Sequence, residues 1–317
     1  MKIECENFLQ SKAWAKMNEL VGHRVISEHI GSSGRVQMII KRAKRGRYME
    51  IPGGPLIDWK NSEEVELAKK KIVDVAREEK CVFVRLRPML LDSAENRAIL
   101  KKMGARKSPM HLAAEHTVIL DLRKTEETIM ADMRRQTRYE VRRAEKLGIK
   151  VEQGNSEKLF KEFHQVQKRT AERQHFVPPD LKTLLAEREA FGENAQIYVA
   201  KTAEGEPIAY GLILKDGDEA DYYEAASTDL NRKLPGAYAL QWQVIRDQKK
   251  AGVLRYNLWG IAPPNQPHHR YAGVTTFKTG FGGEVVAYVP AHDIVINRMK
   301  YVPDFVIETM RKKRRHL

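Results

Sequence analysis

The sequence predicts an α+β fold made of two similar units, in which mixed, mostly antiparallel sheets are flanked by helices. Short segments rich in β-branched and aromatic residues alternate with longer segments of helical periodicity along the chain. The order of these segments in the first part of the chain returns in the second. A chain of 317 residues also exceeds the length over which one core usually grows, so two domains are expected.

The first series of elements has recognisable start and stop signals. Asn61 or Ser62 can cap a helix that ends near Glu79, with Glu64 placed for a capping box. Thr125 opens a long helical stretch that Gly148 can end as a C-terminal cap. The strands expected beside these helices are Val36–Lys41, Cys81–Leu86 and Thr117–Leu122.

The second series follows Gly148. Helices are expected from Ser156 to Arg173, before the break at Pro178-Pro179, and from Gly236 to Ala251. A last helix is expected from Val302 to about Arg314. The expected strands are Ile197–Ala200, Ile208–Leu214, Ala220–Ala226, Leu254–Trp259 and Glu284–Tyr288, with a turn at Gly205 between the first two.

The two series align when Met103-Gly104 is set against Phe281-Gly282, which places Leu100 opposite Lys278. We interpret the alignment as an internal duplication, although chance repetition of a common strand–helix–strand pattern would give the same picture. The predicted boundary lies near Gly148. Residues 1–148 with 298–317 would form the first domain and residues 149–297 the second, with the last helix packed on the first domain.

The charge balance indicates an anionic partner. The chain has 56 Lys and Arg against 42 Asp and Glu, a formal net charge of +14. Nucleic acid, a phosphorylated small molecule and an acidic membrane face all fit such an excess. Part of the charge lies in the tail Arg311-Lys312-Lys313-Arg314-Arg315. Composition alone does not choose among these partners.

The sequence favours a cytoplasmic protein. Its start lacks the apolar run of a signal peptide, and no apolar stretch approaches the length of a spanning helix. Peripheral contact with the inner face of the membrane remains open. With only Cys5 and Cys81, a disulfide framework is not expected. We expect no metal, because the adjacent His268 and His269 cannot easily share one ion and no carboxylate cluster supports them.

A stripe of basic residues marks the helix after Thr125. Arg134, Arg138, Arg142 and Lys146 recur every four residues, so they share one helix face. Like charges at this spacing repel each other, which an anionic ligand would relieve. The stripe is either a polyanion-binding surface or an ordinary solvated helix face.

A lysine beside a glycine-rich turn is the main catalytic candidate. Lys278 follows Phe277 and precedes Gly280, Gly282 and Gly283. Held in place there, its ammonium group could stabilise a developing oxyanion. The turn lacks the spacing of a phosphate-binding P-loop. The alternative is a surface lysine next to a turn.

Two aromatic segments could line a pocket. In the strand from Asp221 to Ser227, alternation predicts that Tyr222 and Glu224 share one face and that Tyr223 points to the other. Trp259 ends a strand that leads into an irregular loop with Pro263 and Pro264.

Taken together, these segments resemble the FemABX aminoacyltransferases, in the compact form without a helical arm. The resemblance spans nearly the whole chain, from Phe8 to Asp293. It rests on six motifs in order, which are Tyr48–Pro55, Gln136–Lys146, Tyr223–Ser227, Ala239–Trp242, Leu258–Ile261 and Phe277–Gly283.

The resemblance implies two GNAT-like domains and a role in peptidoglycan synthesis, hence in cell-wall biogenesis and cell shape. It implies transfer of an amino acid from aminoacyl-tRNA to the stem-peptide side-chain amine of a nucleotide-linked or lipid-linked precursor, without a further cofactor and by a monomer. Lys278 would be the catalytic lysine. The implied substrate-binding residues are Trp14, Lys16, Gly53, Gly54, Tyr222, Tyr223, Trp259 and Phe277.

The chain departs from the family pattern at two positions. Arg87 precedes Pro88 where many members have an acidic residue, and Asn18 stands where a basic residue is common, with Lys16 nearby. Both departures concern the contacts with the precursor.

Two other functions remain open. An acyl-CoA-dependent GNAT enzyme needs a glycine-containing pyrophosphate loop, and Pro235 stands at the required glycine of the nearest segment. A non-catalytic RNA-binding protein would account for the charge but not for the motif around Lys278.

Overall fold

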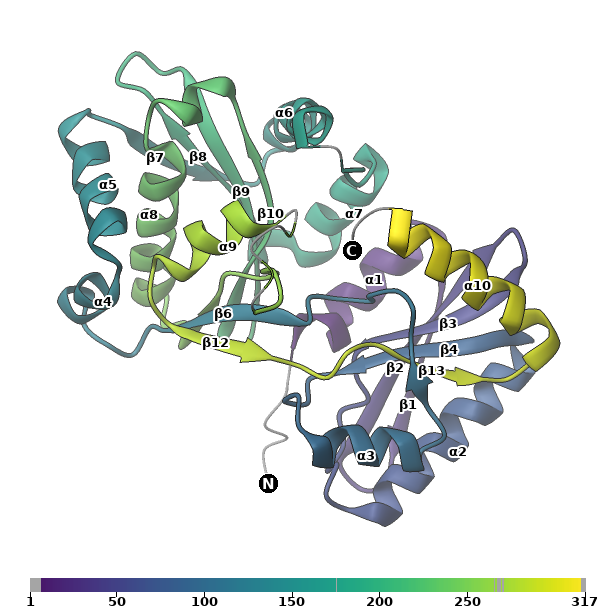
Figure 1. Ribbon diagram of the computed structural model, residues 1–317. Coiled ribbons are helices and arrows are strands. Elements are labelled where there is room, and N and C mark those ends of the chain that lie inside the picture. The colour runs from purple at the N-terminus through teal and green to yellow at the C-terminus, as the bar shows by residue number, and fades with distance from the viewer. Residues whose placement is uncertain (1–6, 175, 265, 267–268, 270, 315–317) are drawn as a thin grey trace. The chain divides into compact units, whose positions relative to one another are not determined.

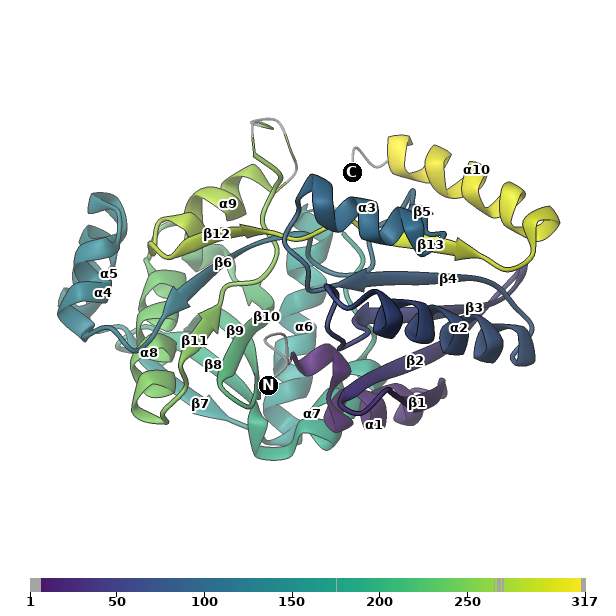
Figure 2. The same cartoon turned by 90° about the horizontal axis from the view of Figure 1, so that it is seen from below.

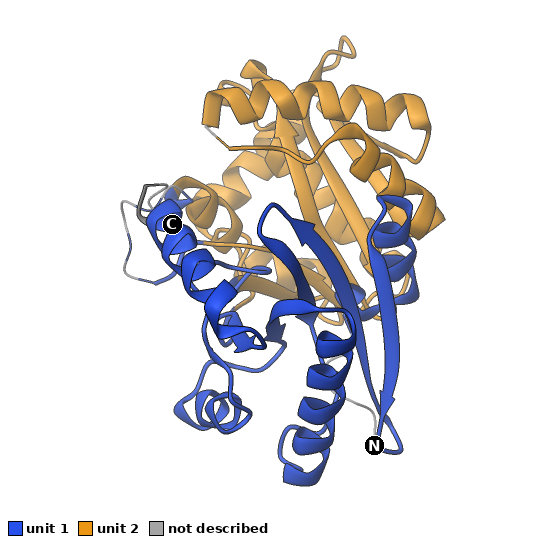
Figure 3. Cartoon of the chain, turned by 90° about the vertical axis from the view of Figure 1, so that its right-hand side faces the viewer, with its two compact units in different colours: residues 1–116, 262–272, 286–317 blue, residues 117–261, 273–285 orange. Residues whose placement is uncertain are grey.

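The computed structural model describes residues 7–174, 176–264, 266, 269 and 271–314, without the side chains of Lys313 and Arg314. The chain divides into two compact units (Figure 3). Unit 1 comprises residues 1–116, 262–272 and 286–317, and unit 2 comprises residues 117–261 and 273–285. No helix among the described residues is long and apolar enough to cross a membrane.

Unit 1 is built on a six-stranded sheet of order β1-β2-β3-β4-β13-β5 (Figure 1). The strands are β1 (Arg24–Ile30), β2 (Gly34–Ala43), β3 (Gly46–Gly53), β4 (Cys81–Pro88), β5 (Arg106–Lys107) and β13 (His292–Val295). The helices are η1 (Phe8–Gln10), α1 (Lys12–Leu20), α2 (Ser62–Glu78), α3 (Ala94–Lys102) and α10 (Arg298–Arg314).

Alternation along β4 assigns the helices of unit 1 to the two sheet faces (Figure 2). Val84 and Leu86 belong to the core that includes Ile72 of α2 and Leu100 of α3. Phe83 points to the other face and packs on Tyr301 of α10, with the rings 5.5 Å apart. Asn61 caps α2 by accepting hydrogen bonds from the amides of residues 63 and 64, as the sequence predicts.

Unit 2 is built on a seven-stranded sheet of order β12-β6-β11-β10-β9-β8-β7. The strands are β6 (His116–Asp121), β7 (Lys150–Gly154), β8 (Ala195–Lys201), β9 (Pro207–Asp216), β10 (Glu219–Ser227), β11 (Arg255–Asn257) and β12 (Glu284–Ala287). The helices are α4 (Glu126–Asp132), α5 (Arg135–Lys146), α6 (Glu157–Gln174), α7 (Leu181–Phe191), η2 (Gly192–Asn194), η3 (Asp229–Arg232), α8 (Gly236–Lys250) and α9 (Ala272–Thr279).

Both sheets contain the same strand pattern, which confirms the predicted mixed α+β class. In unit 1, three antiparallel strands are followed by the parallel pair β3–β4 and then by antiparallel β13. In unit 2, antiparallel β8, β9 and β10 are followed by the parallel pair β10–β11 and then by antiparallel β6. Gly104 and Gly282, which the sequence alignment matched, both have positive φ, 83° and 82°.

The division into units differs from the predicted boundary at Gly148. The strand β6 pairs with β11, so the chain enters the second sheet at residue 117 and takes α4 and α5 into unit 2. Conversely, β13 pairs with β4 and lies in unit 1, although residues up to 297 were expected in the second domain. The β-propensity of a segment predicts where a strand lies in the sequence, but it does not predict which other strand it pairs with.

The long helical stretch predicted after Thr125 is two helices. α4 ends at Asp132, Met133 is extended with ψ 149°, and α5 starts at Arg135. The side chain of Met133 is buried in the unit 2 core, and the amide of Arg134 donates to the carbonyl oxygen of Gly280 at 2.8 Å. These two anchors outweigh the good helix propensity of the segment.

Candidate functional site

Lys278 lies in the last turn of α9 with its side chain buried, at 7% relative exposure. Its Nζ atom donates a hydrogen bond to the carbonyl oxygen of Gly260 at 2.9 Å and lies 5.6 Å from the ring centre of Tyr222. Burial lowers the pKa of the Lys278 ammonium to about 7. Below about pH 7 the site therefore holds a cation whose nearest partners are a neutral carbonyl and an aromatic face.

The Gly260 carbonyl is positioned by Asn257, a residue that sequence reasoning missed. Asn257 is buried at the end of β11, and its Oδ1 accepts a hydrogen bond from the amide of Trp259 at 2.9 Å. Its Nδ2 donates to Glu219 at 3.1 Å, and Thr117 also contacts its side chain. Trp259 has φ 61°, so the predicted strand ends early in a fixed turn that faces Lys278.

The glycines after Lys278 permit close packing against the α4–α5 segment. A side chain at Gly282, where φ is +82°, would place its Cβ 2.8 Å from the carbonyl oxygen of Asp132. At Gly283 the Cβ would lie 2.6 Å from the carbonyl oxygen of Ile119, and at Gly280 it would lie 2.4 Å from the hydroxyl of Thr137. The glycines thus fix the end of α9, and with it Lys278, on the body of unit 2.

Tyr222 and Tyr223 face different surroundings. Tyr222 belongs to the unit 2 core beside Lys278, and Tyr223 contacts Trp259, with ring centres 5.8 Å apart. The prediction that Tyr222 and Glu224 share a face is wrong. A β-bulge shifts the register of β10 between them, so Glu224 accepts a hydrogen bond from Gln167 of α6.

Phe277 packs within an aromatic cluster of unit 2. Its ring centre lies 5.0 Å from that of Tyr238 and 5.2 Å from that of Phe281. Phe277 is half-buried there, and the cluster supports the helix that carries Lys278.

Arg134 and Arg138, two of the four stripe residues, have structural partners. The guanidinium of Arg134 donates to the carbonyl oxygen of Thr276 at 2.5 Å and to the hydroxyl of Thr279 at 3.2 Å. Arg138 donates to the carbonyl oxygen of Ala131 at 3.0 Å, at the C-terminal end of α4. Arg134 therefore joins the basic helix directly to the helix of Lys278.

The outer part of α5 lines a basic concavity of about 550 Å³. Tyr139 is exposed within it, and Arg143 is held by Glu140 at 3.1 Å and by the carbonyl oxygen of Lys233 at 3.0 Å. The lining residues are Arg135, Arg138, Tyr139, Arg142, Arg143 and Lys146. A concavity with several guanidinium groups and one exposed ring suits a polyanion that also has aromatic bases.

The substrate residues expected in unit 1 lie around η1, α1 and the end of β3. Trp14 is buried against Phe8, with ring centres 5.4 Å apart, whereas Lys16 is exposed. Gly53 has φ 71°, and its carbonyl oxygen accepts a hydrogen bond from the side chain of Asn7 at 3.1 Å. Gly54 lies against the side chain of Gln10. The glycine loop is therefore braced by the segment that leads into α1.

Arg87, the departure from the family pattern, is completely buried at the end of β4. Its register partner is Pro52, next to the Gly53 loop. Its guanidinium carbon lies 5.3 Å from the ring centre of Tyr288, and Nη1 lies 3.1 Å from the sulfur of Met89. Burial lowers the pKa of Arg87 to about 10, so the group stays charged at neutral pH.

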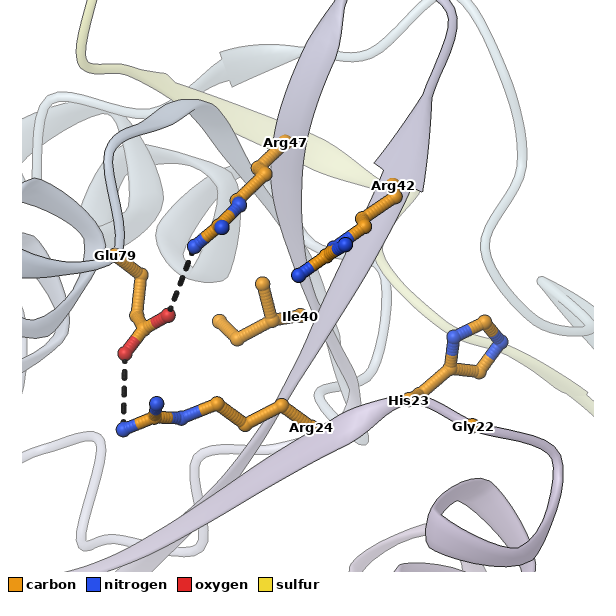
Figure 4. Close-up of a pocket in the computed structure, with 7 residues that line it drawn as sticks. All are labelled: Gly22, His23, Arg24, Ile40, Arg42, Arg47 and Glu79. Atoms are coloured by element: carbon orange, nitrogen blue, oxygen red, sulfur yellow. Dashed lines mark ion pairs between the residues drawn. The ribbon is translucent and has the colours of Figure 1, made fainter.

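A second basic concavity, in unit 1, was not anticipated (Figure 4). It measures about 470 Å³ and is lined by Gly22, His23, Arg24, Ile40, Arg42, Arg47 and Glu79. Glu79 pairs with Arg24 at 3.1 Å and with Arg47 at 3.6 Å. Arg42 lies directly opposite Arg47 in the β2–β3 ladder, a like-charge pair that normally destabilises a sheet. The run Lys41-Arg42-Ala43-Lys44-Arg45-Gly46-Arg47 is the sequence signal that could have revealed it.

No cluster of three or more metal-ligating side chains occurs among the described residues. His269 contacts Tyr271, with ring centres 5.2 Å apart. His268 and Arg270, from the same loop, lie outside the described residues, as do Cys5 and Arg315.

Comparison with known proteins agrees with this architecture. The solved structure of FemX superposes with a TM-score of 0.84 at 17% identity, covering 96% of this chain and 95% of that one. A tandem GNAT protein from the clavulanic acid biosynthesis pathway gives a TM-score of 0.52 at 13% identity, covering 83% and 79%. The two units are therefore a duplicated pair of GNAT-like domains, as the resemblance implied.

Sequence comparisons give the family. Aminoacyltransferase FemA of Staphylococcus aureus strain MRSA252 is 22% identical over 80% of this chain and 81% of its own length. FemA of Staphylococcus epidermidis is 33% identical over 95 residues, a match that spans 30% of this chain but only 23% of that protein. The model of the FemAB family matches residues 1–206 and 193–307. The chain therefore belongs to the FemAB family.

Proposed function

We propose that this protein transfers an aminoacyl group from aminoacyl-tRNA to the side-chain amine of the stem peptide in a peptidoglycan precursor. The observation that carries the proposal is the buried Lys278 ammonium beside Tyr222, held by the Gly260 carbonyl. Membership of the FemAB family and the similarity to FemA, an aminoacyltransferase by name, support the choice of reaction.

The reaction needs placement more than chemical activation. The neutral acceptor amine attacks the ester carbonyl carbon of the aminoacyl-tRNA, the C–O bond to the ribose breaks, the amine loses one proton, and the ribose oxygen gains one. An aminoacyl ester is already activated, so correct positioning of both substrates lowers the barrier substantially.

Lys278 would stabilise the tetrahedral intermediate. An ammonium group has three donors, and one of them is directed to the Gly260 carbonyl. The others can meet the oxyanion that forms when the amine attacks. Because the lysine is fixed by the α9 packing and little exposed, its charge is not weakened by water at the moment of reaction.

The basic concavity on α5 would receive the tRNA. Arg142 and Lys146 line it without an ion pair in the described structure, and Arg134, the residue before α5, donates a hydrogen bond to Thr276 of α9. A phosphate bound on α5 would then lie on a helix that is hydrogen-bonded, through Arg134, to the helix that carries Lys278. Tyr223 and Trp259 would border the reacting end of the substrates in unit 2.

The residues of unit 1 would hold the precursor. Trp14, Lys16 and the Gly53–Gly54 loop would contact it, and the buried Arg87 beside that loop would contribute a positive charge. We further propose that the enzyme works in the cytoplasm as a monomer, on a nucleotide-linked or lipid-linked precursor, and thereby contributes to cell-wall biogenesis and cell shape.

The direct test is product formation from defined substrates. Purified protein is incubated with a mixed pool of charged tRNAs and either the nucleotide-linked or the lipid-linked precursor, and the product mass is measured. We expect the precursor to gain the mass of one aminoacyl group. This gain should be absent when the charged tRNA is digested with ribonuclease before the reaction. No mass increase with any charged tRNA and either precursor would refute the proposal.

An acyl-CoA-dependent transfer is the second candidate, favoured by the likeness to a tandem GNAT protein. The start of α8 argues against it, because Pro235 removes one amide and the amide of Ala237 already donates to Asn231 at 3.0 Å. A rise in melting temperature with acetyl-CoA would favour this candidate over aminoacyl-tRNA.

A further inference from the structure

The last helix of unit 1, α10, is held to the sheet by one face. Tyr301 and Phe305 pack with Phe83 of β4 and Tyr48 of β3. Glu308 pairs with Arg85 at 2.7 Å, and Asp304 pairs with Arg45. The two carboxylates of α10 thus both point toward the β-sheet side of the helix, where arginines neutralise them.

The opposite face of α10 is apolar and exposed. Met299 is 86% exposed, Val302 51%, Val306 49% and Met310 65%. Their spacing of three, four and four residues places them in one stripe along the helix. We call these four residues the α10 stripe. A continuous apolar stripe facing water over most of a helix indicates a contact that the isolated chain leaves unmade.

Basic side chains border the α10 stripe. Arg298 and Lys300 lie at its N-terminal end, and Arg311 and Lys312 lie at its C-terminal end. Because Asp304 and Glu308 are turned inward, the exposed surface of the helix combines apolar and positively charged groups. This is the composition of helices that lie in the plane of a membrane interface.

We propose that α10 docks this protein on an anionic lipid surface, with the α10 stripe inserted among the acyl chains and the basic residues at the headgroups. The charge pattern favours lipid over a second copy of the chain. A symmetric dimer across the stripe would bring two sets of like charges together, whereas acidic headgroups are complementary to them. Docking is measured without substrates, so it stands or falls separately from the proposed transfer.

The test is sedimentation of the full chain with vesicles of phosphatidylcholine, alone or mixed two to one with phosphatidylglycerol. The wild-type chain is expected to sediment with the mixed vesicles and not to bind the neutral ones. Val306→Ser with Met310→Ser is expected to lower the partition coefficient by about tenfold or more, because both side chains lose apolar contact with lipid. Lys300→Gln and Arg311→Gln should each lower it about fivefold.

A matched control keeps the result specific. Leu91→Ser with Val177→Ser also removes two exposed apolar side chains, 60% and 87% exposed, but leaves α10 unchanged. This variant should bind vesicles like the wild type. Equal binding by the α10 stripe variant, or no binding of the wild type to mixed vesicles, would overturn the proposal. So would a wild-type dimer in sedimentation velocity that the stripe variant abolishes, since the stripe would then be a self-association surface.

Discussion

The Nζ atom of Lys278 lies 2.9 Å from the carbonyl oxygen of Gly260 and donates a hydrogen bond to it. This partner is neutral, and burial lowers the pKa of the lysine. A carboxylate in the same place would cancel the charge and raise the pKa instead. The protein thus keeps a cation in a poorly solvated position, where a transient anion gains most from it.

Replacing Lys278 by methionine should remove this cation while keeping the volume of the side chain. We expect transfer to fall by about 100- to 1000-fold, as for the loss of an oxyanion donor elsewhere. Single-turnover rates with preformed aminoacyl-tRNA measure the loss, and circular dichroism checks the fold. Near-full activity in a folded Lys278→Met variant would exclude the assigned role.

The pH dependence of the rate should report the same group. Since the pKa of Lys278 is about 7, its protonated fraction falls above neutrality. The acceptor amine must be neutral to attack, and its neutral fraction keeps rising until about pH 10.5, near the ordinary pKa of a side-chain amine. We therefore expect kcat/KM to rise up to about pH 7 and then to level off, whereas the residual kcat/KM of Lys278→Met should keep rising above pH 7.

The stability of unit 2 should also respond to this lysine. The pKa lies below the ordinary value of 10.5, so between about pH 7 and pH 10.5 the unfolded chain binds more protons than the folded one. The free energy of unfolding should therefore gain a contribution as the pH rises through this window. Urea unfolding of Lys278→Met should lack that gain, whereas an identical gain in both proteins would contradict the lowered pKa.

The glycines after α9 allow a paired test of how Lys278 is held. Gly282→Ala forces a side chain into positive φ and against the Asp132 carbonyl, so we expect a loss of about 1–3 kcal/mol and reduced transfer. Gly273→Ala is the control, because Gly273 lies within α9 itself and has open space around it. It should be neutral or stabilise by up to about 1 kcal/mol. Equal effects of the two changes on urea unfolding would show that packing at Gly282 is unimportant.

Neutralising the α5 concavity should weaken tRNA binding in a salt-dependent way. The logarithm of the binding constant for tRNA falls as the logarithm of the salt concentration rises. We expect Arg142→Gln and Lys146→Gln each to reduce the magnitude of this negative slope by about 1. Arg77→Gln is the control, because Arg77 is an exposed arginine on α2 of unit 1, paired with Asp74. Filter binding at several salt concentrations distinguishes the variants. Unchanged slopes for the α5 variants would move the tRNA site elsewhere.

The sequence predicts features that depend on residues close together in the chain, but not those that depend on contacts between distant residues. The cap at Asn61 and the strands β4 and β9 follow from local pattern, because side-chain period and turn chemistry act within a few residues. The exchange of β6 and β13 between the sheets could not be predicted, since pairing is decided by contacts far apart in the chain.

The side-chain details of the site escaped prediction for a related reason. The bulge between Tyr222 and Glu224 reverses one step of alternation, and no residue in that strand signals it. The break before Arg134 depends on a hydrogen bond to Gly280, which lies far along the chain. Asn257 acts through a turn that only the folded chain forms. The motif around Lys278 therefore gave the candidate site, while the residues that support Lys278 could be identified only in the structure.

A buried carboxyl pair in unit 2 gives a final prediction of opposite sign to that of Lys278. Glu187 is fully buried on α7, and its pKa is raised by burial and by the neighbouring Glu224, whose own pKa burial raises to about 7. Between pH 4.5, the ordinary pKa of a glutamate, and about pH 7, the folded state therefore binds more protons than the unfolded chain. The free energy of unfolding should fall as the pH rises through this range.

Glu187→Gln removes the repulsion and leaves a neutral side chain of the same size. Its urea midpoint should fall less than that of the wild type between about pH 5 and pH 8, and it should exceed the wild-type midpoint at the higher pH. Glu172→Gln, an exposed change on α6, should leave the wild-type dependence intact. If Glu187→Gln and the wild type lost stability in parallel, Glu187 would not be a group that titrates in this range, because a neutral glutamine cannot contribute to that loss.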